Sequence, residues 1–272
     1  MSACRLVMTD IDGTVMPYGR DRVSRRTVDA IHAAQAAGIE CGPVSGRFYG
    51  WIPRFFRDDE ACCSTAIAAN GAQVWHCGEL VCERTMDPSA LREACRVLRE
   101  VPRSGMVLFA GDRPLLVQGS REDLAVAFPR YARECEDAPG VPDAPVVKAN
   151  AFVRGTLDET RAMVDLLARS VPELDFDLPQ PMFCNMMAHG WNKGSALAWL
   201  CDYLSVPLDE AVVFGDAGND VALFERATHS VAVAGATPEA RDAARWHVGR
   251  CEDDAVAQAI EALARGEWPF SA

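Results

Sequence analysis

The 272-residue chain is poor in lysine and has no excess of positive charge. Only two lysines, Lys148 and Lys193, occur among its 27 lysine and arginine residues, and the formal net charge is −12. A protein that binds the phosphate backbone of nucleic acids normally presents a basic surface. The charge balance therefore argues against a nucleic-acid partner. Because lysine is so rare, each of the two lysines is a candidate for a specific role.

Long apolar runs and regularly spaced cysteines are also missing. No apolar stretch approaches the roughly 20 residues that cross a bilayer, so we expect no membrane partner. The eleven cysteines include no Cys-x-x-Cys pair and no Cys/His spacing typical of a metal site, and we find no secretory leader. An odd number of cysteines without an export signal indicates reduced thiols, and we expect a cytoplasmic protein.

What the chain does have is a pair of carboxylates near its start. Asp10-Ile11-Asp12-Gly13-Thr14 follows the apolar run Leu6-Val7-Met8. Residues i and i+2 of an extended chain point the same way, so Asp10 and Asp12 would project together from a strand end, where open α/β sheets bind ligands. Two carboxylates there can divide the work of phosphoryl transfer. One attacks phosphorus and the other handles the proton of the leaving group.

Two other interpretations of this motif are a hairpin turn and a calcium-binding loop. Asp-Gly is common in hairpin turns, and Asp-x-Asp opens calcium loops. A calcium loop beginning at Asp10 would need Gly sixth and Glu twelfth, but Val15 and Asp21 stand there. The motif alone therefore disfavours the calcium loop and leaves a structural turn open.

Three later segments also follow apolar runs, as expected if neighbouring strands bring them to one sheet edge. Ser45-Gly46-Arg47 follows residues 39–44, and its hydroxyl and glycine amide could hold phosphate oxygens, although a Ser-Gly pair is more often only a turn. Lys193 precedes a helix-like stretch through Leu204 and would supply a compact cation. A solvated surface lysine is the alternative.

The last of these segments, Gly215-Asp216-Ala217-Gly218-Asn219-Asp220, follows the apolar residues 211–214. Small residues allow a tight turn, and Asp216 and Asp220 bring two more carboxylates to a strand end. Oxygen ligands with phosphate as a co-ligand suit Mg²⁺, which seldom binds in an all-protein cage. The alternative is an Asx-rich loop that caps the helix beginning at Val221.

The motifs divide the chain unequally, and this predicts its domains. They all lie in residues 1–83 and 183–272, the two expected parts of a core, and residues 84–182 carry none. Apolar runs alternate with helix-like stretches in the core, which predicts an α/β fold with a doubly wound parallel sheet. Helices beside hairpin-linked strands predict an α+β cap domain in the middle. The expected core strands cover residues 6–8, 39–44, 66–69, 212–214 and 231–233.

The four motifs, in this order and spacing, resemble the haloacid dehalogenase superfamily of phosphohydrolases. They are most similar to its Cof-type branch, which has a Rossmann-like core and an inserted C2-type cap. The resemblance runs from about Leu6 to about Leu263. Ser45 stands where threonine is commoner and Trp191 where a small aliphatic residue is commoner, and neither change removes a functional group.

The resemblance implies a role for each motif residue. Asp10 would be the nucleophile that becomes phosphorylated, and Asp12 would protonate the leaving oxygen and then activate water. The remaining roles are phosphate binding by Thr14, Ser45, Gly46, Lys193 and Asn219; substrate contact by Arg47, Asn70 and Gly71; and Mg²⁺ binding by Asp10, Asp12 through its main-chain carbonyl, Asp216 and Asp220.

The expected function is a Mg²⁺-dependent phosphatase that acts on a small phosphorylated metabolite through an aspartyl-phosphate. The resemblance suggests a sugar or polyol phosphate. A phosphomutase or phosphotransferase would use the same phosphoenzyme. A phospho-accepting signalling or binding protein is a third class, but such a module needs no inserted segment of about a hundred residues and no second carboxylate at Asp12. The particular substrate and the oligomeric state do not follow from the sequence.

Overall fold

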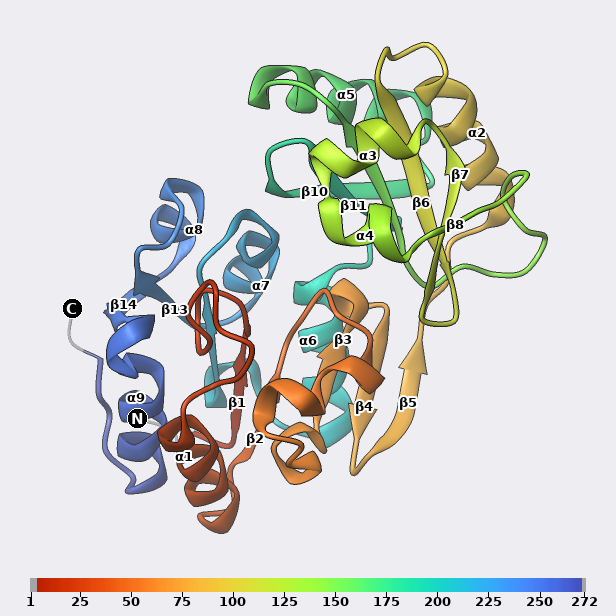
Figure 1. Cartoon of the computed structure of the whole chain (residues 1–272). Helices are drawn as coiled ribbons and strands as arrows, with labels where there is room; N and C mark the ends of the chain where they lie inside the picture. Colours follow the sequence, from red (N-terminus) through yellow and green to blue (C-terminus); the bar gives the residue numbers. More distant parts are fainter. Residues whose placement is uncertain (1–3, 271–272) are drawn as a thin grey trace. The chain divides into compact units, whose positions relative to one another are not determined.

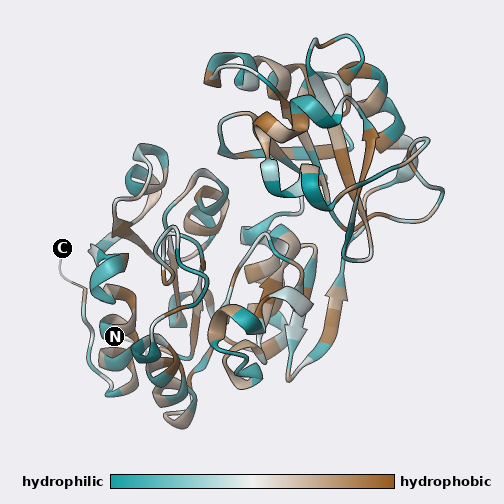
Figure 2. Cartoon of the chain, viewed as in Figure 1, coloured by the Kyte–Doolittle hydropathy of each residue, from teal (hydrophilic) through white to brown (hydrophobic). Residues whose placement is uncertain are grey.

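The computed structural model describes residues 4–270, which form two compact units (Figure 1). The first unit contains residues 4–83 and 192–270, and the second contains Arg84–Trp191. Figure 2 shows hydrophobic residues along the strands of both units and hydrophilic residues on many loops and helix surfaces. None of the helices within residues 4–270 is long and apolar enough to cross a membrane.

The first unit is built on a five-stranded parallel sheet in the order β14-β13-β12-β1-β2. The chain passes from β1 to β2 on one side and later returns to β12 on the other side of β1. The strand order therefore reverses between β1 and β12, which is where open α/β sheets bind ligands. The strands are β1 (Leu6–Thr9), β2 (Glu40–Pro43), β12 (Ala211–Gly215), β13 (His229–Ala234) and β14 (Trp246–Arg250).

Helices flank this sheet. Ile31 of α1 and Ile260 of α9 belong to the same buried cluster as Val7 of β1 and Val212 of β12, so these two helices cover one face. Met8 alternates with Val7 along β1 and therefore faces the other way. No residue of α6 or α7 belongs to the cluster on the first face, and these two helices pack against each other. The helices are α1 (Arg25–Ala36), α6 (Lys193–Leu204), α7 (Val221–Arg226), α8 (Pro238–Ala243) and α9 (Ala255–Ala264).

A short antiparallel sheet extends the first unit beyond β2. Its strand β3 adjoins the end of β2, where the Ser45 N–H donates to the Ile67 carbonyl at 2.8 Å. The sheet consists of β3 (Ala66–Ala68), β4 (Gln73–His76) and β5 (Glu79–Glu83). The connections contain the 3₁₀ turns η1 (Tyr49–Trp51), η2 (Pro53–Phe56), η3 (Glu60–Cys63), η4 (Ala69–Gly71), η5 (Leu208–Glu210), η6 (Gly218–Asp220) and η7 (Cys251–Asp253).

The second unit has a six-stranded sheet in the order β10-β11-β9-β6-β7-β8, antiparallel except between β7 and β8. Helices α2 and α5 share its main buried cluster, and α3 and α4 contact the same sheet. The strands are β6 (Ser104–Ala110), β7 (Arg113–Gln118), β8 (Glu136–Asp137), β9 (Ala149–Val153), β10 (Leu174–Gln180) and β11 (Phe183–Ala188). The helices are α2 (Pro88–Leu98), α3 (Arg121–Ala127), α4 (Pro129–Glu134) and α5 (Leu157–Ser170).

The predicted fold class, a parallel α/β core with an inserted α+β region, is confirmed. All five expected core strands are present, as β1, β2, β3, β12 and β13, although β3 pairs antiparallel with β4. The expected end of the insertion at residue 182 differs from the structure. There β11 pairs with both β9 and β10, so the second unit continues to Trp191.

Gly42 in β2 offers a direct test of this packing. A Cβ atom there would lie 1.8 Å from the Thr65 carbonyl oxygen. Because backbone must move to admit it, Gly42→Ala should lower the free energy of unfolding by about 1–3 kcal/mol. Urea unfolding followed by tryptophan fluorescence measures the change. Gly50→Ala is the matched control, since a Cβ at Gly50 meets no atom within 4 Å, and equal stability losses in the two variants would contradict the prediction.

Candidate active site

Two adjacent parallel strands place two carboxylates at one sheet edge. Asp10 follows β1, and Asp216 follows β12. The register pairs Thr9 with Phe214, and the Asp10 N–H donates to the Phe214 carbonyl at 2.9 Å. The strand pairing therefore continues up to Asp10 and holds its backbone beside Gly215. Both carboxylates are buried, with residue exposures of 6% for Asp10 and 5% for Asp216.

Lys193 joins this edge from the first turn of α6. It is 1% exposed, and its Nζ donates to Asp10 Oδ1 at 2.7 Å and to Asp220 Oδ1 at 2.6 Å. A buried ammonium is costly unless it is paired and hydrogen-bonded. Burial alone would lower the pKa of Lys193, but the two carboxylates raise it overall. Lys193 is therefore a buried, charged residue of the cluster and not a solvated surface lysine.

Asp220 shapes the loop after β12. Its Oδ2 accepts hydrogen bonds from the N–H groups of Asp216 at 3.0 Å and Ala217 at 3.1 Å, while Oδ1 binds Lys193. Both oxygens of Asp220 are thus engaged. A Cβ on Gly215 would lie 2.6 Å from Asp220 Cγ, so glycine at this position lets the carboxylate fold back onto the loop.

Asp216 receives two hydroxyl donors. Thr14 Oγ1 donates to Oδ1 at 3.2 Å, and the Tyr18 hydroxyl donates to Oδ2 at 2.9 Å. Burial raises the pKa of Asp216 to about 6, with the Asp220 charge adding to this and the Tyr18 hydrogen bond opposing it. Thr14 was expected to bind phosphate and here binds Asp216. Tyr18 carried no signal in the sequence, because it lies outside every motif.

The buried carboxylates form a potential cation site. Ligand oxygens of Asp10, Asp216 and Asp220 all lie within 4.8 Å of one another. Three carboxylates with Lys193 as the neighbouring cation leave a formal charge of −2, which suits a divalent ion with oxygen ligands. Burial, with repulsion from Asp220 and Asp216, raises the pKa of Asp10 despite the attraction of Lys193. The oxygen ligands and the net negative charge of the cluster together fit Mg²⁺.

Asp12 points to a different partner. Arg47 binds its carboxylate through two hydrogen bonds, from Nε to Oδ2 at 3.0 Å and from Nη2 to Oδ1 at 2.6 Å. The guanidinium carbon also lies 4.1 Å from the centre of the Phe55 ring. The Asp12 side chain does not belong to the buried acidic cluster, and Arg47, expected at the substrate, holds Asp12 in this structure.

Ser45 and Asn70 lie side by side at the end of β2. The Asn70 N–H donates to the Ser45 carbonyl at 3.0 Å, and Ser45 Oγ accepts from the Arg47 N–H at 3.3 Å. A Cβ on Gly46 would lie 2.8 Å from Asn70 Oδ1. This amide oxygen is buried and has no hydrogen-bond partner among the described residues.

Gly71 and Asn219 are the two expected site residues that remain. Gly71 has a φ of +102°, and a Cβ there would lie 2.4 Å from the Asn192 carbonyl oxygen, so Gly71 allows the backbone to pass closely by the start of α6. Asn219 is half-buried in η6. In the described part of the chain Asn219 makes no hydrogen bond to the acidic cluster.

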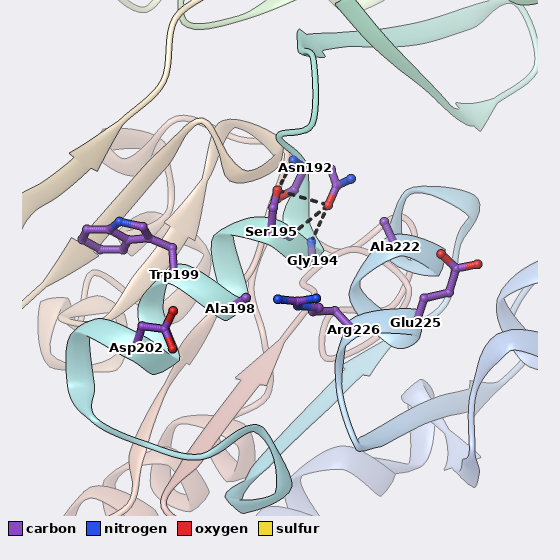
Figure 3. Close-up of a pocket in the computed structure, with 9 residues that line it drawn as sticks. All are labelled: Asn192, Gly194, Ser195, Ala198, Trp199, Asp202, Ala222, Glu225 and Arg226. Carbon is purple, nitrogen blue, oxygen red and sulfur yellow. Dashed lines mark hydrogen bonds between the residues drawn. The ribbon is translucent and has the colours of Figure 1, made fainter.

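A groove of about 560 Å³ lies between α6 and α7 (Figure 3). In Figure 3 the Arg226 side chain points from α7 towards α6, and Asn192 accepts hydrogen bonds from Gly194 and Ser195 at the start of α6. None of the expected site residues lines this groove. The groove is therefore separate from the buried acidic cluster at the sheet edge.

Comparisons with known proteins agree with this architecture. The sequence profile of a family described as haloacid dehalogenase-like hydrolase matches residues 7–260. Phosphoglycolate phosphatase of Methanothermobacter thermautotrophicus is 26% identical over 259 residues, 94% of this chain and 97% of that protein. Mannosylfructose-phosphate phosphatase of Agrobacterium fabrum is 41% identical over 92 residues, 34% of this chain and 35% of that protein. A solved subclass IIB sugar phosphatase, BT4131, superposes with a TM-score of 0.80 at 19% identity, covering 94% of this chain and 98% of the other.

The raised pKa of Asp216 makes a pH-dependent prediction for the protein without divalent metal. The unionised carboxyl favours the fold, so its contribution is fully present below the ordinary pKa of 3.8 and is lost as the pH rises through about 6. Asp216→Asn should therefore stabilise the metal-free protein by up to about 3 kcal/mol near pH 7.5 and by much less near pH 4.5. Urea unfolding in a chelator measures both values.

The exposed Asp112, in the turn after β6, provides the control for that measurement. Asp112→Asn should leave stability almost unchanged at both pH values. A gain from Asp216→Asn that is the same at the two pH values would show that the pKa of Asp216 is not the cause.

Proposed function

This chain belongs to the haloacid dehalogenase-like hydrolase family and is a phosphatase, and we propose that it hydrolyses a small phosphorylated metabolite, a sugar or polyol phosphate, with Mg²⁺ and an aspartyl-phosphate at Asp10. One observation carries the proposal: the buried ammonium of Lys193 joins Asp10 to Asp220 beside Asp216. The names of the sugar phosphatase and the mannosylfructose-phosphate phosphatase support the substrate class.

Asp10 is arranged to act as a nucleophile. Lys193 holds Oδ1, and Oδ2 accepts no hydrogen bond from the described residues. We therefore assign Oδ2 to the attack on phosphorus, in line with the departing oxygen of the substrate. The bond between phosphorus and that oxygen breaks as the bond from Asp10 to phosphorus forms, and hydrolysis of the resulting acyl phosphate restores the carboxylate.

Charge stabilisation in the site can contribute more to the rate acceleration than proton transfer can. Phosphate-monoester hydrolysis is so slow that catalysis can reach about 10²¹-fold, or about 29 kcal/mol. General acid or base assistance supplies only about 10²- to 10⁴-fold. Most of the acceleration must come from positioning and charge stabilisation. The buried cluster contains the charges that this requires.

We assign the metal to Asp10 and Asp216, together with the main-chain carbonyl of Asp12. When bound, Mg²⁺ would supply positive charge beside the phosphoryl oxygens. Asp220 would act indirectly, since Lys193 and the amides of the β12 loop already use both of its oxygens. Thr14 and Tyr18 would orient the Asp216 carboxylate through their hydroxyl groups.

Asp12 would serve as the acid and then the base. A carboxylate clamped by both nitrogens of a guanidinium cannot present a proton to the leaving oxygen through those same atoms. We therefore propose that the pair of Asp12 and Arg47 opens when substrate binds. Asp12 would then protonate the leaving oxygen and later take a proton from the attacking water, while Arg47 and the unpartnered oxygen of Asn70 contact the substrate.

Replacing the proposed nucleophile tests the reaction directly. Asp10→Asn should reduce the rate of phosphate release by at least about 10⁴-fold, because an amide is a poor nucleophile. Chelation should stop the wild-type reaction, and added Mg²⁺ should restore it. Asp242→Asn, at an exposed carboxylate of α8, should retain full activity. Retained turnover by Asp10→Asn would exclude this nucleophile.

A screen of phosphorylated sugars, polyols, nucleotides and cofactors tests the substrate class. We expect free phosphate from sugar or polyol phosphates above all and a hydroxylamine-sensitive phosphoenzyme in rapidly quenched samples. A phosphomutase would convert one phosphate isomer into another and release little phosphate. Turnover without any trapped phosphoenzyme would contradict the proposed intermediate.

A further inference from the structure

A second group of potential metal ligands lies where α1 packs against η3. His32 belongs to α1, Asp59 immediately precedes η3, and Cys62 lies within η3. His32 Nε2 lies 2.8 Å from Asp59 Oδ2 and 3.9 Å from Cys62 Sγ. All three ligand atoms lie within 4.8 Å of one another. None of these residues belongs to the proposed active site.

Local structure holds the three side chains together. Residues three apart in a 3₁₀ turn point the same way, and the Cys62 N–H donates to the Asp59 carbonyl at 3.2 Å. Gln35 lies one turn after His32 on α1, and its Nε2 donates to the Ala61 carbonyl at 2.8 Å. This bond from a side chain to the backbone ties α1 to η3 beside the cluster, and so holds together the two segments that carry the ligands.

The contacts around His32 are unusual for a simple hydrogen-bonded pair. The Asp59 carboxylate and the Cys62 sulfur both approach the same ring nitrogen, Nε2, which carries only one proton or one lone pair. In a catalytic Cys-His-Asp arrangement the carboxylate would contact Nδ1 and leave Nε2 to the nucleophile. Cys62 is also fully buried. The geometry is therefore that of convergent ligands and not of a nucleophile with its base.

We propose that His32, Asp59 and Cys62 bind Zn²⁺, with water as the fourth ligand. Zinc bonds of about 2.0–2.3 Å in a tetrahedron place neighbouring ligand atoms about 3.3–3.6 Å apart. The observed separations of 2.8 Å and 3.9 Å bracket this range, so small side-chain movements complete the site. The side chains of His32 and Asp59 are 42% and 33% exposed, which gives the fourth ligand access from solvent.

The donor set distinguishes this site from the acidic cluster at the sheet edge. Sulfur, nitrogen and oxygen ligands suit zinc, whereas carboxylate oxygens suit magnesium. Binding transfers the thiol proton of Cys62 to water, and the thiolate together with the Asp59 carboxylate then balances the charge of Zn²⁺. The bound ion would clip α1 to η3.

Cobalt titration tests the proposal, because Co²⁺ reports its ligands in its absorption spectrum. Metal-free protein should bind about one equivalent of Co²⁺ with a thiolate charge-transfer band and the visible bands of tetrahedral cobalt, and Zn²⁺ should displace it. The acidic cluster contains no sulfur and cannot give the charge-transfer band. Cys62→Ser should abolish that band, and His32→Gln should weaken Co²⁺ binding by at least about tenfold.

Cys77 is the matched control. Its sulfur lies 3.3 Å from His76 Nε2 and is exposed, so it is the competing Cys/His pair in the described chain. Cys77→Ser should keep the charge-transfer band. Loss of the band in Cys77→Ser with retention in Cys62→Ser, or no band in the wild type, would overturn the proposal. If Cys62→Ser fails to fold, Asp59→Asn is tested in its place. Unchanged Zn²⁺ affinity in Asp59→Asn would also overturn the proposal.

Discussion

The buried charge of Lys193 is the interaction on which the site depends. Its ammonium contacts carboxylates 183 positions before it and 27 positions after it. Without this cation, Asp10 and Asp220 would be buried anions with no counter-charge, which folded proteins rarely tolerate. With it, the cluster still carries excess negative charge beside Asp216. The same arrangement therefore holds the sheet edge together and leaves a place for a divalent ion.

The central strands and the site carboxylates could be predicted because they carry local signals. β1 and β12 are continuous apolar runs, as buried parallel strands are, and acidic residues follow each of them directly. The insertion boundary was harder, because β11 in residues 183–188 belongs to the second unit although its sequence alone does not say which sheet it joins. β14 was also missed. Its residues are mostly partly or fully exposed at the sheet edge, so apolar patterning is weak there.

Side-chain pairings could not be read from the sequence, because their partners are distant in the chain. Tyr18 binds Asp216 across 198 positions, and Arg47 binds Asp12 across 35. A motif shows that a carboxylate is present, but it does not show which group donates hydrogen bonds to that carboxylate. The same reason explains why His32 and Cys62, 30 positions apart, show no recognisable metal spacing. Ligand chemistry then separates the two clusters, since one offers only oxygen and the other includes sulfur and nitrogen.

The neighbour of β1 on its inner side is β12, about two hundred positions later in the chain. Such a distant pairing means that the central strand stays without this partner during most of synthesis on the ribosome. A nascent chain that ends before Asp216 contains the whole second unit and the opening motif but lacks the turn that completes the cluster. The acidic cluster therefore cannot form in stages as the chain is made. It forms only after β12 and Asp216 have been synthesised and β12 has paired with β1.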